Sequence, residues 1–301
     1  GTDVGNKFRF LDDGLSLVAN AANLGSITVD ESALIGGVGN PDPTILATMT
    51  NSTFLNGVFT PTYGTDGSGG ALVYSLQVAN PGVNSGLVDT ATGEIIYLFL
   101  EAGVVIGRVG SGGSPDLAGI EAIRISLAGG EAVTLSQFRA VEHPTGGASH
   151  DESIALLNGA LSVRAVARDG DGDTAIQDVN IGSRFTFLDD GPAFISASAT
   201  QTVDEADLPL GSSPNAHALT VNGSLNVNFG MDTGAATSRD VQFTIDTQTK
   251  LEAWADNNSN PNLTVSISPD GHTLTALNNG NPAFTVTLAV AANGAVTYVF
   301  T

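Results

Sequence analysis

Residues 184–191 read RFTFLDDG and residues 7–14 read KFRFLDDG, so one pattern occurs twice in the chain. Each copy places two phenylalanines on alternate positions, which point to the same face of a β-strand, and then ends on two aspartates and a glycine. A pattern that returns after so long an interval is typical of an array of domains, each able to fold by itself.

Three further blocks recur in the same order between the two copies. They pair Val29, Asp30 and Glu31 with Val203, Asp204 and Glu205; Tyr63, Gly64 and Asp66 with Phe229, Gly230 and Asp232; and Val133 and Thr134 with Val296 and Thr297. The offset between matched residues shrinks along the chain, which predicts one fold with shorter loops in the second copy.

This register divides the chain into three parts. Residues 1–14 are the predicted tail strand and linker of a preceding repeat, 15–187 a first β-sandwich repeat and 188–301 a second. Thr301 then matches Phe138, so the second repeat lacks counterparts of residues 139–187. This truncation, together with Gly1 in place of an initiating Met, predicts that the chain is a fragment of a longer array.

Composition narrows the class of protein. The 301 residues are 42% hydrophobic, enough to bury two ordinary cores, and contain no cysteine, so neither disulfides nor thiolate metal sites hold the fold. The formal net charge of −21 would repel nucleic acid and anionic membranes, and no apolar run approaches the ~20 residues of a membrane span. Asp far outnumbers Glu, which favours turns and loops that bind hard cations, with Ca²⁺ as the first candidate.

Alternating apolar and polar residues predict an all-β fold. We predict two tandem antiparallel β-sandwich domains of Ig-like type, with strands over 72–78, 95–100, 104–109, 120–127, 161–167, 174–181, 241–245, 263–267 and 284–290. The final strand of the first repeat is expected to run from Thr174 to Phe187. Only short stretches such as Leu135–Glu142 have a helical pattern, and Trp254 is expected in the core.

The DGDGD stretch, residues 169–173, is the strongest candidate metal site. Glycines between Asp169, Asp171 and Asp173 let three carboxylates turn toward one centre, as a cation with 6–8 oxygen ligands requires. The stretch starts like an EF-hand loop but departs from it at Thr174 and Asn180, and no GGxGxD run of a calcium β-roll is present. A plain acidic turn is the alternative.

Paired acids at the repeat boundaries form a second set of candidates. Asp12–Asp13 and Asp189–Asp190 follow the repeated FxFL motif, where a bound cation would link neighbouring repeats; the alternative is a solvated turn. Asp30–Glu31 and Asp204–Glu205 each follow a valine in a predicted early strand, with at least one acid of each pair expected at a sandwich tip. Asp66 and Asp232 stand in glycine-containing loops that the same tip could hold.

Other chemistry has little support in the sequence. Residues 143–152 hold His143, His150, Asp151 and Glu152, for which zinc is conceivable, but such residues in a glycine-rich loop are more often surface groups. The motifs GxSxG, HExxH, GxxxxGK and GxGxxG are absent, as is a thiol nucleophile. Repeated Asp pairs do not suit a glycosidase dyad, which needs one cleft. We therefore predict a protein that is not an enzyme.

Several motifs together resemble the tandem repeats of giant repeats-in-toxin (RTX) adhesins, which Gram-negative bacteria export by type I secretion. The resemblance rests on FLDDGP (187–192), VDES (29–32), YGTDG (63–67), 85–109, 134–144 and DGDGDTA (169–175). It covers nearly all of the first repeat and is weaker after Asp232. It implies extracellular, Ca²⁺-dependent extender domains that space an adhesive module from the cell and support attachment or biofilm formation.

Two functions follow as hypotheses. The first is a calcium-stabilised spacer that contacts calcium ions and neighbouring repeats, located on the cell surface or secreted. The second is a module that binds a glycan or peptide through a calcium-dependent site. Repetition favours the spacer, and an aromatic-lined groove in one repeat would favour the second.

Overall fold

The computed structural model describes residues 13–31, 47–143, 152–230, 239–258, 261–291 and 294–301. The chain divides by its internal contacts into two compact units, Gly1–Asp190 and Gly191–Thr301, called unit 1 and unit 2 below. The described part of both is built mainly of strands and holds one α-helix. The prediction of an all-β fold is therefore confirmed at that level.

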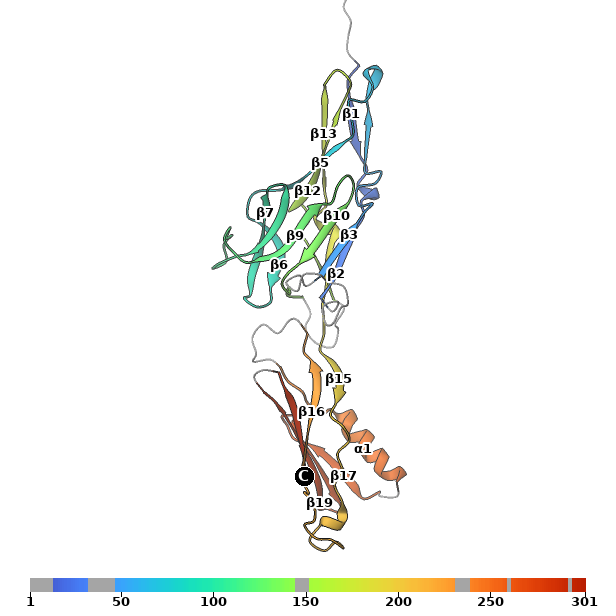
Figure 1. Ribbon diagram of the computed structural model, residues 1–301, viewed down its shortest axis with the longest axis vertical. Coiled ribbons are helices and arrows are strands. Elements are labelled where there is room, and N and C mark those ends of the chain that lie inside the picture. The colour runs from blue at the N-terminus through green and yellow to red at the C-terminus, as the bar shows by residue number, and fades with distance from the viewer. Residues whose placement is uncertain (1–12, 32–46, 144–151, 231–238, 259–260, 292–293) are drawn as a thin grey trace, which may run out of the picture. The chain divides into compact units, whose positions relative to one another are not determined.

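A six-stranded antiparallel sheet is the largest element of unit 1 (Figure 1). Its strands form because alternate side chains can face the core. In the sequence VTLSQ, for example, Val133, Leu135 and Gln137 are buried and the residues between them are not. In spatial order the strands are β3 (Ala47–Asn51), β10 (Val133–Gln137), β9 (Glu121–Leu127), β8 (Val104–Val109), β7 (Glu94–Glu101) and β6 (Val83–Asp89).

Three smaller sheets complete unit 1. Their strands are β13 (Thr174–Asn180), β12 (Leu161–Arg168) and β5 (Val73–Val78); β11 (Ser153–Ala155), β14 (Phe185–Leu188) and β2 (Ile27–Asp30); and β1 (Ser16–Ala19) with β4 (Phe59–Thr62). The 3-10 turns are η2 (Ala21–Asn23), η4 (Gly64–Asp66) and η5 (Gly182–Arg184). Of these pairings, only β14 with β2 is parallel.

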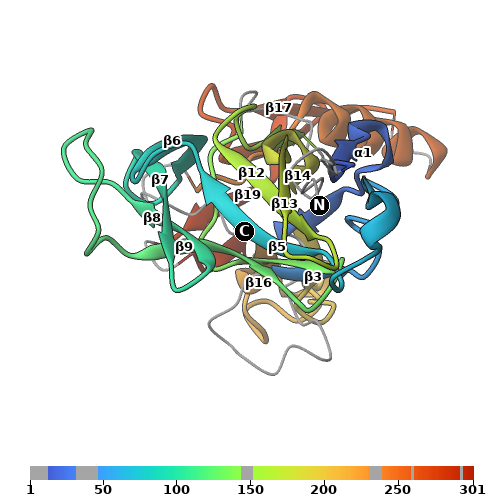
Figure 2. The same cartoon turned by 90° about the horizontal axis from the view of Figure 1, so that it is seen from above.

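The core of unit 1 lies between these sheets. β5 packs against β7, β8 and β9, and the view from above shows β6 to β9 beside β5, β12 and β13 (Figure 2). β12 buries Leu161, Val163, Ala165 and Ala167 on one face. Phe54 and Phe185 stack with ring centroids 5.5 Å apart, and both are fully buried. Large rings and β-branched side chains thus fill one continuous core.

Unit 2 has one six-stranded antiparallel sheet and a helix. In spatial order the strands are β15 (Ala193–Ala197), β16 (Val221–Asn228), β20 (Val296–Phe300), β19 (Asn281–Val290), β18 (Thr273–Asn278) and β17 (Leu263–Ile267). Helix α1 (Ile245–Asn257) packs on β17, and η6 spans Glu205–Asp207. The buried cluster comprises Ala255, Leu263, Val265, Leu274 and Ala276, far fewer residues than the core of unit 1.

The two large sheets share five strands in the same order. β16, β20, β19, β18 and β17 follow one another as β3, β10, β9, β8 and β7 do. The connections before β10 and β20 also match, since Ala128 N donates to Ala132 O at 2.9 Å and Ala291 N donates to Ala295 O at 2.8 Å. Val133 pairs with Leu127 as Val296 pairs with Val290. The repeated residues therefore occupy equivalent positions in both sheets.

Several local predictions are wrong. The strand expected over 174–187 is broken after Asn180 by η5, and Gly182 of η5 lies so close to the carbonyl of Leu157 that a Cβ would clash there. Leu135–Glu142 does not form a helix, because its first residues pair with β9 and β3.

Two further corrections concern unit 2. Residues 241–244 form no strand, and α1 begins at Ile245 with Thr244 as its N-cap in a capping box. Lys250, Leu251, Glu252 and Ala253 are strong helix formers, which explains the helix. Trp254 lies on α1 and is 61% exposed, so it is not a core residue.

Candidate functional site

The DGDGD acids lie in the turn between β12 and β13. Oxygen atoms of Asp169, Asp171 and Asp173 lie within 4.8 Å of one another. Asp169 is buried and the other two are exposed. Among the described residues, no other set of three or more His, Cys, Asp or Glu side chains brings its ligand atoms this close together.

The backbone of this turn directs the acids toward one another. Gly172 has φ of 111°, which L side chains rarely adopt, and its N–H donates to Asp169 Oδ1 at 3.0 Å. Asp169 N donates to Asp173 O at 3.1 Å and closes the turn. The glycines that the sequence places between the acids therefore have the expected role.

A second loop brings two more predicted acids to the same end of unit 1. Gly170 N donates to Gly67 O at 3.0 Å, which places the turn against η4 and Asp66. Asp13 accepts from the backbone N and from Oγ1 of Thr65, each at 2.9 Å. We call Asp13, Asp66, Asp169, Asp171 and Asp173 the tip cluster. The turn of the β12–β13 hairpin, which carries three of them, lies near β1 in Figure 1.

The other predicted acids of unit 1 gather at the end marked by β2 in Figure 1. Because β14 runs parallel to β2 with Leu188 opposite Asp30, the next residues of both strands, Asp189 and Glu31, emerge at the same edge. Asp189 N donates to Glu152 O at 3.0 Å, which continues the pairing of β14 with β11 by one residue. We call Asp30, Glu31, Glu152, Asp189 and Asp190 the β2–β14 cluster.

Several carboxylates of the β2–β14 cluster are buried. Glu31 is fully buried, and its Oε1 accepts from Gln137 Nε2 at 2.5 Å and from Val141 N at 2.9 Å. Asp189 and Asp190 are 9% and 5% exposed. Burying several carboxylates together is costly unless cations or donors compensate their charge. Glu31 has such donors, and within the described residues the structure does not bring three ligand atoms of this cluster as close together as those of the DGDGD turn. A cation at this cluster therefore stays a prediction.

His143 belongs to this cluster and not to a separate site. Its side chain is 2% exposed, with Nδ1 3.4 Å from Asp189 Oδ1 and Nε2 3.3 Å from Phe187 O. His150 and Asp151, the other residues considered for zinc, lie outside the described residues.

The donor chemistry of the DGDGD turn fits a hard cation. Asp169, Asp171 and Asp173 offer carboxylate oxygens from one short turn, and the side chains of Asp171 and Asp173 are exposed to solvent. Ca²⁺ accepts 6–8 oxygens in flexible geometry, whereas Mg²⁺ requires a small octahedral shell. Asp169, Asp171 and Asp173 are therefore the residues that would hold Ca²⁺ most directly.

The predicted acids of unit 2 have different surroundings. Asp204 caps η6 by accepting from Ala206 N at 2.9 Å, and Glu205 is exposed. Val203 lies outside any strand, contrary to the expected early strand of this repeat. Asp12 and Asp232 lie outside the described residues. Sequence analysis missed the buried Asp207, which lies 3.0 Å from His217 Nδ1.

A buried ion pair in unit 1 was also missed. Asp89 is 1% exposed and accepts from Arg139 Nε at 2.5 Å and Nη2 at 2.9 Å. These hydrogen bonds raise the pKa of Arg139. The two residues are 50 positions apart, so no local sequence pattern indicates the pair. It ties the end of β6 to the segment after β10.

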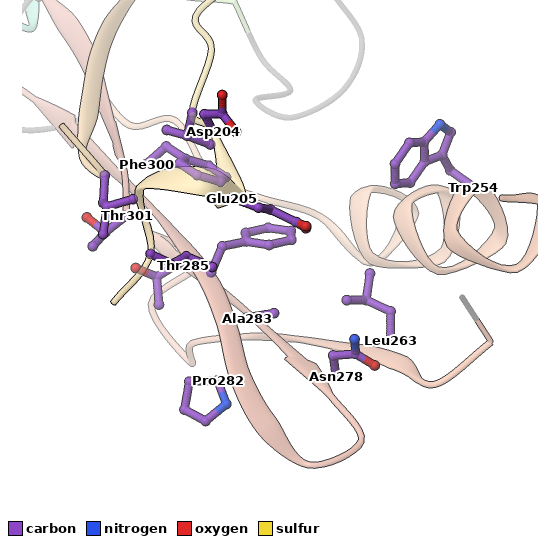
Figure 3. Close-up of a pocket in the computed structure, with 14 residues that line it drawn as sticks. Asp204, Glu205, Trp254, Leu263, Asn278, Pro282, Ala283, Thr285, Phe300 and Thr301 are labelled. Atoms are coloured by element: carbon purple, nitrogen blue, oxygen red, sulfur yellow. The ribbon is translucent and has the colours of Figure 1, made fainter. Parts of the chain in front are cut away.

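Unit 2 contains an apolar groove of about 670 Å³. Figure 3 shows Phe300, Asp204 and Glu205 on one side of it and Trp254 of α1 on the other. Phe284 and Phe300 stack with centroids 5.2 Å apart. Val203 and Leu208 add apolar surface, so the lining combines aromatic rings with an acidic edge.

Outside the groove, unit 2 holds a cluster of one histidine and two aspartates just before β18. His272 Nε2 lies 2.6 Å from Asp240 Oδ1, and His272 Nδ1 lies 3.7 Å from Asp270 Oδ2. The hydrogen bond to Asp240 raises the pKa of His272, and the same bond lowers the pKa of Asp240.

Comparison with known proteins gives one match. The family model described as "Domain of unknown function (DUF5801)" matches residues 26–182, just over half of the chain. The matched range runs from β2 through the DGDGD turn to η5. No curated protein and no solved structure matches the chain. Within the described residues, no helix has the length and apolar character needed to cross a membrane.

Proposed function

The chain belongs to the DUF5801 family, and we propose that it forms calcium-stabilised extracellular extender repeats of a large bacterial surface adhesin. In this role the repeats space an adhesive module from the cell and support attachment or biofilm formation. The proposal assigns the chain no catalytic activity. It places the protein outside the cell, with calcium ions and neighbouring repeats as partners.

The observation that carries this proposal is the convergence of Asp169, Asp171 and Asp173 within 4.8 Å. Three carboxylates this close repel one another, and a divalent cation would turn the repulsion into attraction. The buried acids of the β2–β14 cluster add a second place for compensation at the other end of unit 1.

The packing of unit 1 supports a sandwich-type repeat, because the sheet β13-β12-β5 packs against the six-stranded sheet. The described part of unit 2 repeats five strands of that large sheet in the same order and forms one sheet with a helix. A structural role requires the same unit many times, whereas a ligand site needs to be built once. The motif resemblance to RTX adhesins supports export by type I secretion.

Thermal unfolding with and without calcium tests the proposal. At about 10 mM free Ca²⁺, sites with affinities of about 10⁻⁴ to 10⁻³ M would add about 1–3 kcal/mol each. We expect the melting temperature of unit 1 to fall after chelation and to recover with Ca²⁺. Equal recovery with Mg²⁺ would indicate general screening of the −21 charge. An unchanged melting temperature would contradict the proposal.

The groove of unit 2 favours a second candidate function. Its aromatic lining from Trp254, Phe284 and Phe300 suits a module that binds a glycan or peptide. A calcium-dependent contact is open to Asp204 and Glu205 at its edge. Titration with glycan and peptide panels, with and without Ca²⁺, distinguishes this role from a spacer without ligands.

A further inference from the structure

The repeated VDE motif has a strand partner in unit 1 but a groove beside it in unit 2. In unit 1, Val29 lies in β2, is 3% exposed and pairs with Phe187 of β14. In unit 2, the matching Val203 lies outside any strand, is 37% exposed and lines the groove. The VDE motif is therefore covered by a neighbouring strand in unit 1, whereas in unit 2 it borders a groove.

The floor of the groove is also equivalent to a covered position in unit 1. β10 and β20 share a register, so Gln137 of β10 matches Phe300 of β20. Gln137 is fully buried and donates to Glu31 at the end of β2. Phe300 lies in the groove together with Glu205, the match of Glu31, as Figure 3 shows. The groove thus borders residues 203–205, the unit 2 match of the strand that β14 covers in unit 1.

We propose that this groove docks an extended segment of the pattern Phe-x-Phe-Leu, which lies parallel to residues 201–205 as β14 lies along β2. The chain itself carries this pattern at 184–191, already paired in unit 1, and at 7–14. Backbone hydrogen bonds along the open edge would give affinity, and the two rings would cover Phe284, Phe300 and Val203. The inference specifies the ligand of the binding role above and does not depend on calcium.

The lining favours this occupant over a sugar. Apolar side chains, among them Val203, Leu208, Trp254, Phe284 and Phe300, dominate the surface. A sugar requires several converging polar groups, whereas an extended chain needs apolar pockets at every second residue and one open backbone edge. Asp204 has an extended backbone, with φ of −114° and ψ of 126°, and residues 201–204 belong to no strand.

Charge adds a specific expectation. In the register of β14 on β2, Leu188 lies opposite Asp30, so the two aspartates after the Phe-x-Phe-Leu pattern would lie near Asp204 and Glu205. Like charges this close repel. A peptide with asparagines in their place, RFTFLNNG, should therefore bind more tightly than RFTFLDDG in the absence of divalent cations.

Trp254 reports binding directly, because it is the only tryptophan of the chain and lines the groove. The full chain is titrated with RFTFLNNG in chelator while tryptophan emission is followed. We expect a saturable change, and at least tenfold weaker binding for RSTSLNNG, which lacks the two rings. Equal affinity for both peptides, or no response to either, overturns the proposal whether or not calcium stabilises unit 1.

Two exposed valines provide matched variants. Val203→Asp places a charge in the groove and should weaken RFTFLNNG at least tenfold. Val299→Asp lies on β20 between Tyr298 and Phe300, hence on the opposite face of the sheet, and should leave binding unchanged. Circular dichroism confirms that both variants fold. Wild-type affinity in folded Val203→Asp would contradict docking at this edge.

Discussion

Unit 1 and unit 2 contain the same VDE motif in opposite environments. Glu31 is fully buried at the end of a paired strand, whereas Glu205 is exposed in a short 3-10 turn. The difference lies in what covers the motif, because β14 pairs with β2 in unit 1. Whether these four residues form a strand therefore depends on a neighbouring strand as much as on their own sequence.

The same comparison applies to the cores. Unit 1 buries rings and branched side chains from two layers, while the apolar face of the unit 2 sheet is covered in part by α1. Phe284 and Phe300 remain half-buried. Mutations of matched type should consequently cost unequal amounts in the two units.

The largest expected effect is on the phenylalanine of the repeated pattern. Phe187 is fully buried, so Phe187→Ala should destabilise unit 1 by about 3–5 kcal/mol through lost burial and a cavity. Phe284→Ala in unit 2 removes a half-buried ring and should cost less than half as much. Denaturant unfolding followed by hydrogen exchange in each unit measures both. Equal losses would show that the groove is as well packed as the core of unit 1.

Much of this comparison is visible in the sequence. The repeat placed Val133 and Val296 in equivalent strands, and alternation located β7, β8, β9 and β17 to within a residue. It did not identify the other strands of the two large sheets, apart from part of β19. The prediction failed at Trp254, which lies on a helix instead of a strand. Helix α1 follows β16 and precedes β17 in the sequence. It depends on capping by Thr244 and on helix-forming residues that are hard to recognise among so many predicted strands.

The candidate site was predictable where it is local. Asp169, Asp171 and Asp173 come together because glycines separate them within one turn. The meeting of Glu31 with Asp189 needed the parallel pairing of β2 with β14, and the Asp89–Arg139 pair needed contact across 50 residues. Neither follows from a periodic pattern, because tertiary contacts determine both.

The second prediction separates the two VDE motifs. Glu31→Ala should destabilise unit 1 by about 2 kcal/mol, because Gln137 Nε2 and Val141 N lose a buried acceptor. Glu205→Ala should change the stability of unit 2 by less than about 0.5 kcal/mol, as is usual for an exposed side chain. Chemical denaturation of both variants provides the measurement. A comparable loss in Glu205→Ala would mean that the two environments are alike.

The third prediction concerns calcium at the tip cluster. Asp171→Ala should lower the calcium affinity of the chain about tenfold, equivalent to about 1.4 kcal/mol, since it removes the central carboxylate of the turn. Asp116→Ala serves as the matched control, because Asp116 caps a separate turn by accepting from Ala118 N at 2.9 Å. Calorimetric titration compares the two. Indistinguishable isotherms would make the DGDGD stretch a plain acidic turn.

The smallest expected effect is the pH dependence that His272 gives to unit 2. The hydrogen bond to Asp240 raises the pKa of His272 above its ordinary value of 6.5. Protonated His272 therefore favours the folded state. This contribution is complete below the unfolded-state pKa and disappears as the pH rises through the higher folded-state pKa.

The stability of unit 2 should accordingly decline slightly across that window, while His272 leaves unit 1 unaffected. Asp240→Asn removes the charged partner and should return the pKa of His272 toward 6.5 and abolish the decline. NMR titration of the His272 ring in both proteins measures the pKa directly. An Asp240→Asn variant with the wild-type pKa would show that Asp270, 3.7 Å from Nδ1, supports the charge of the ring instead.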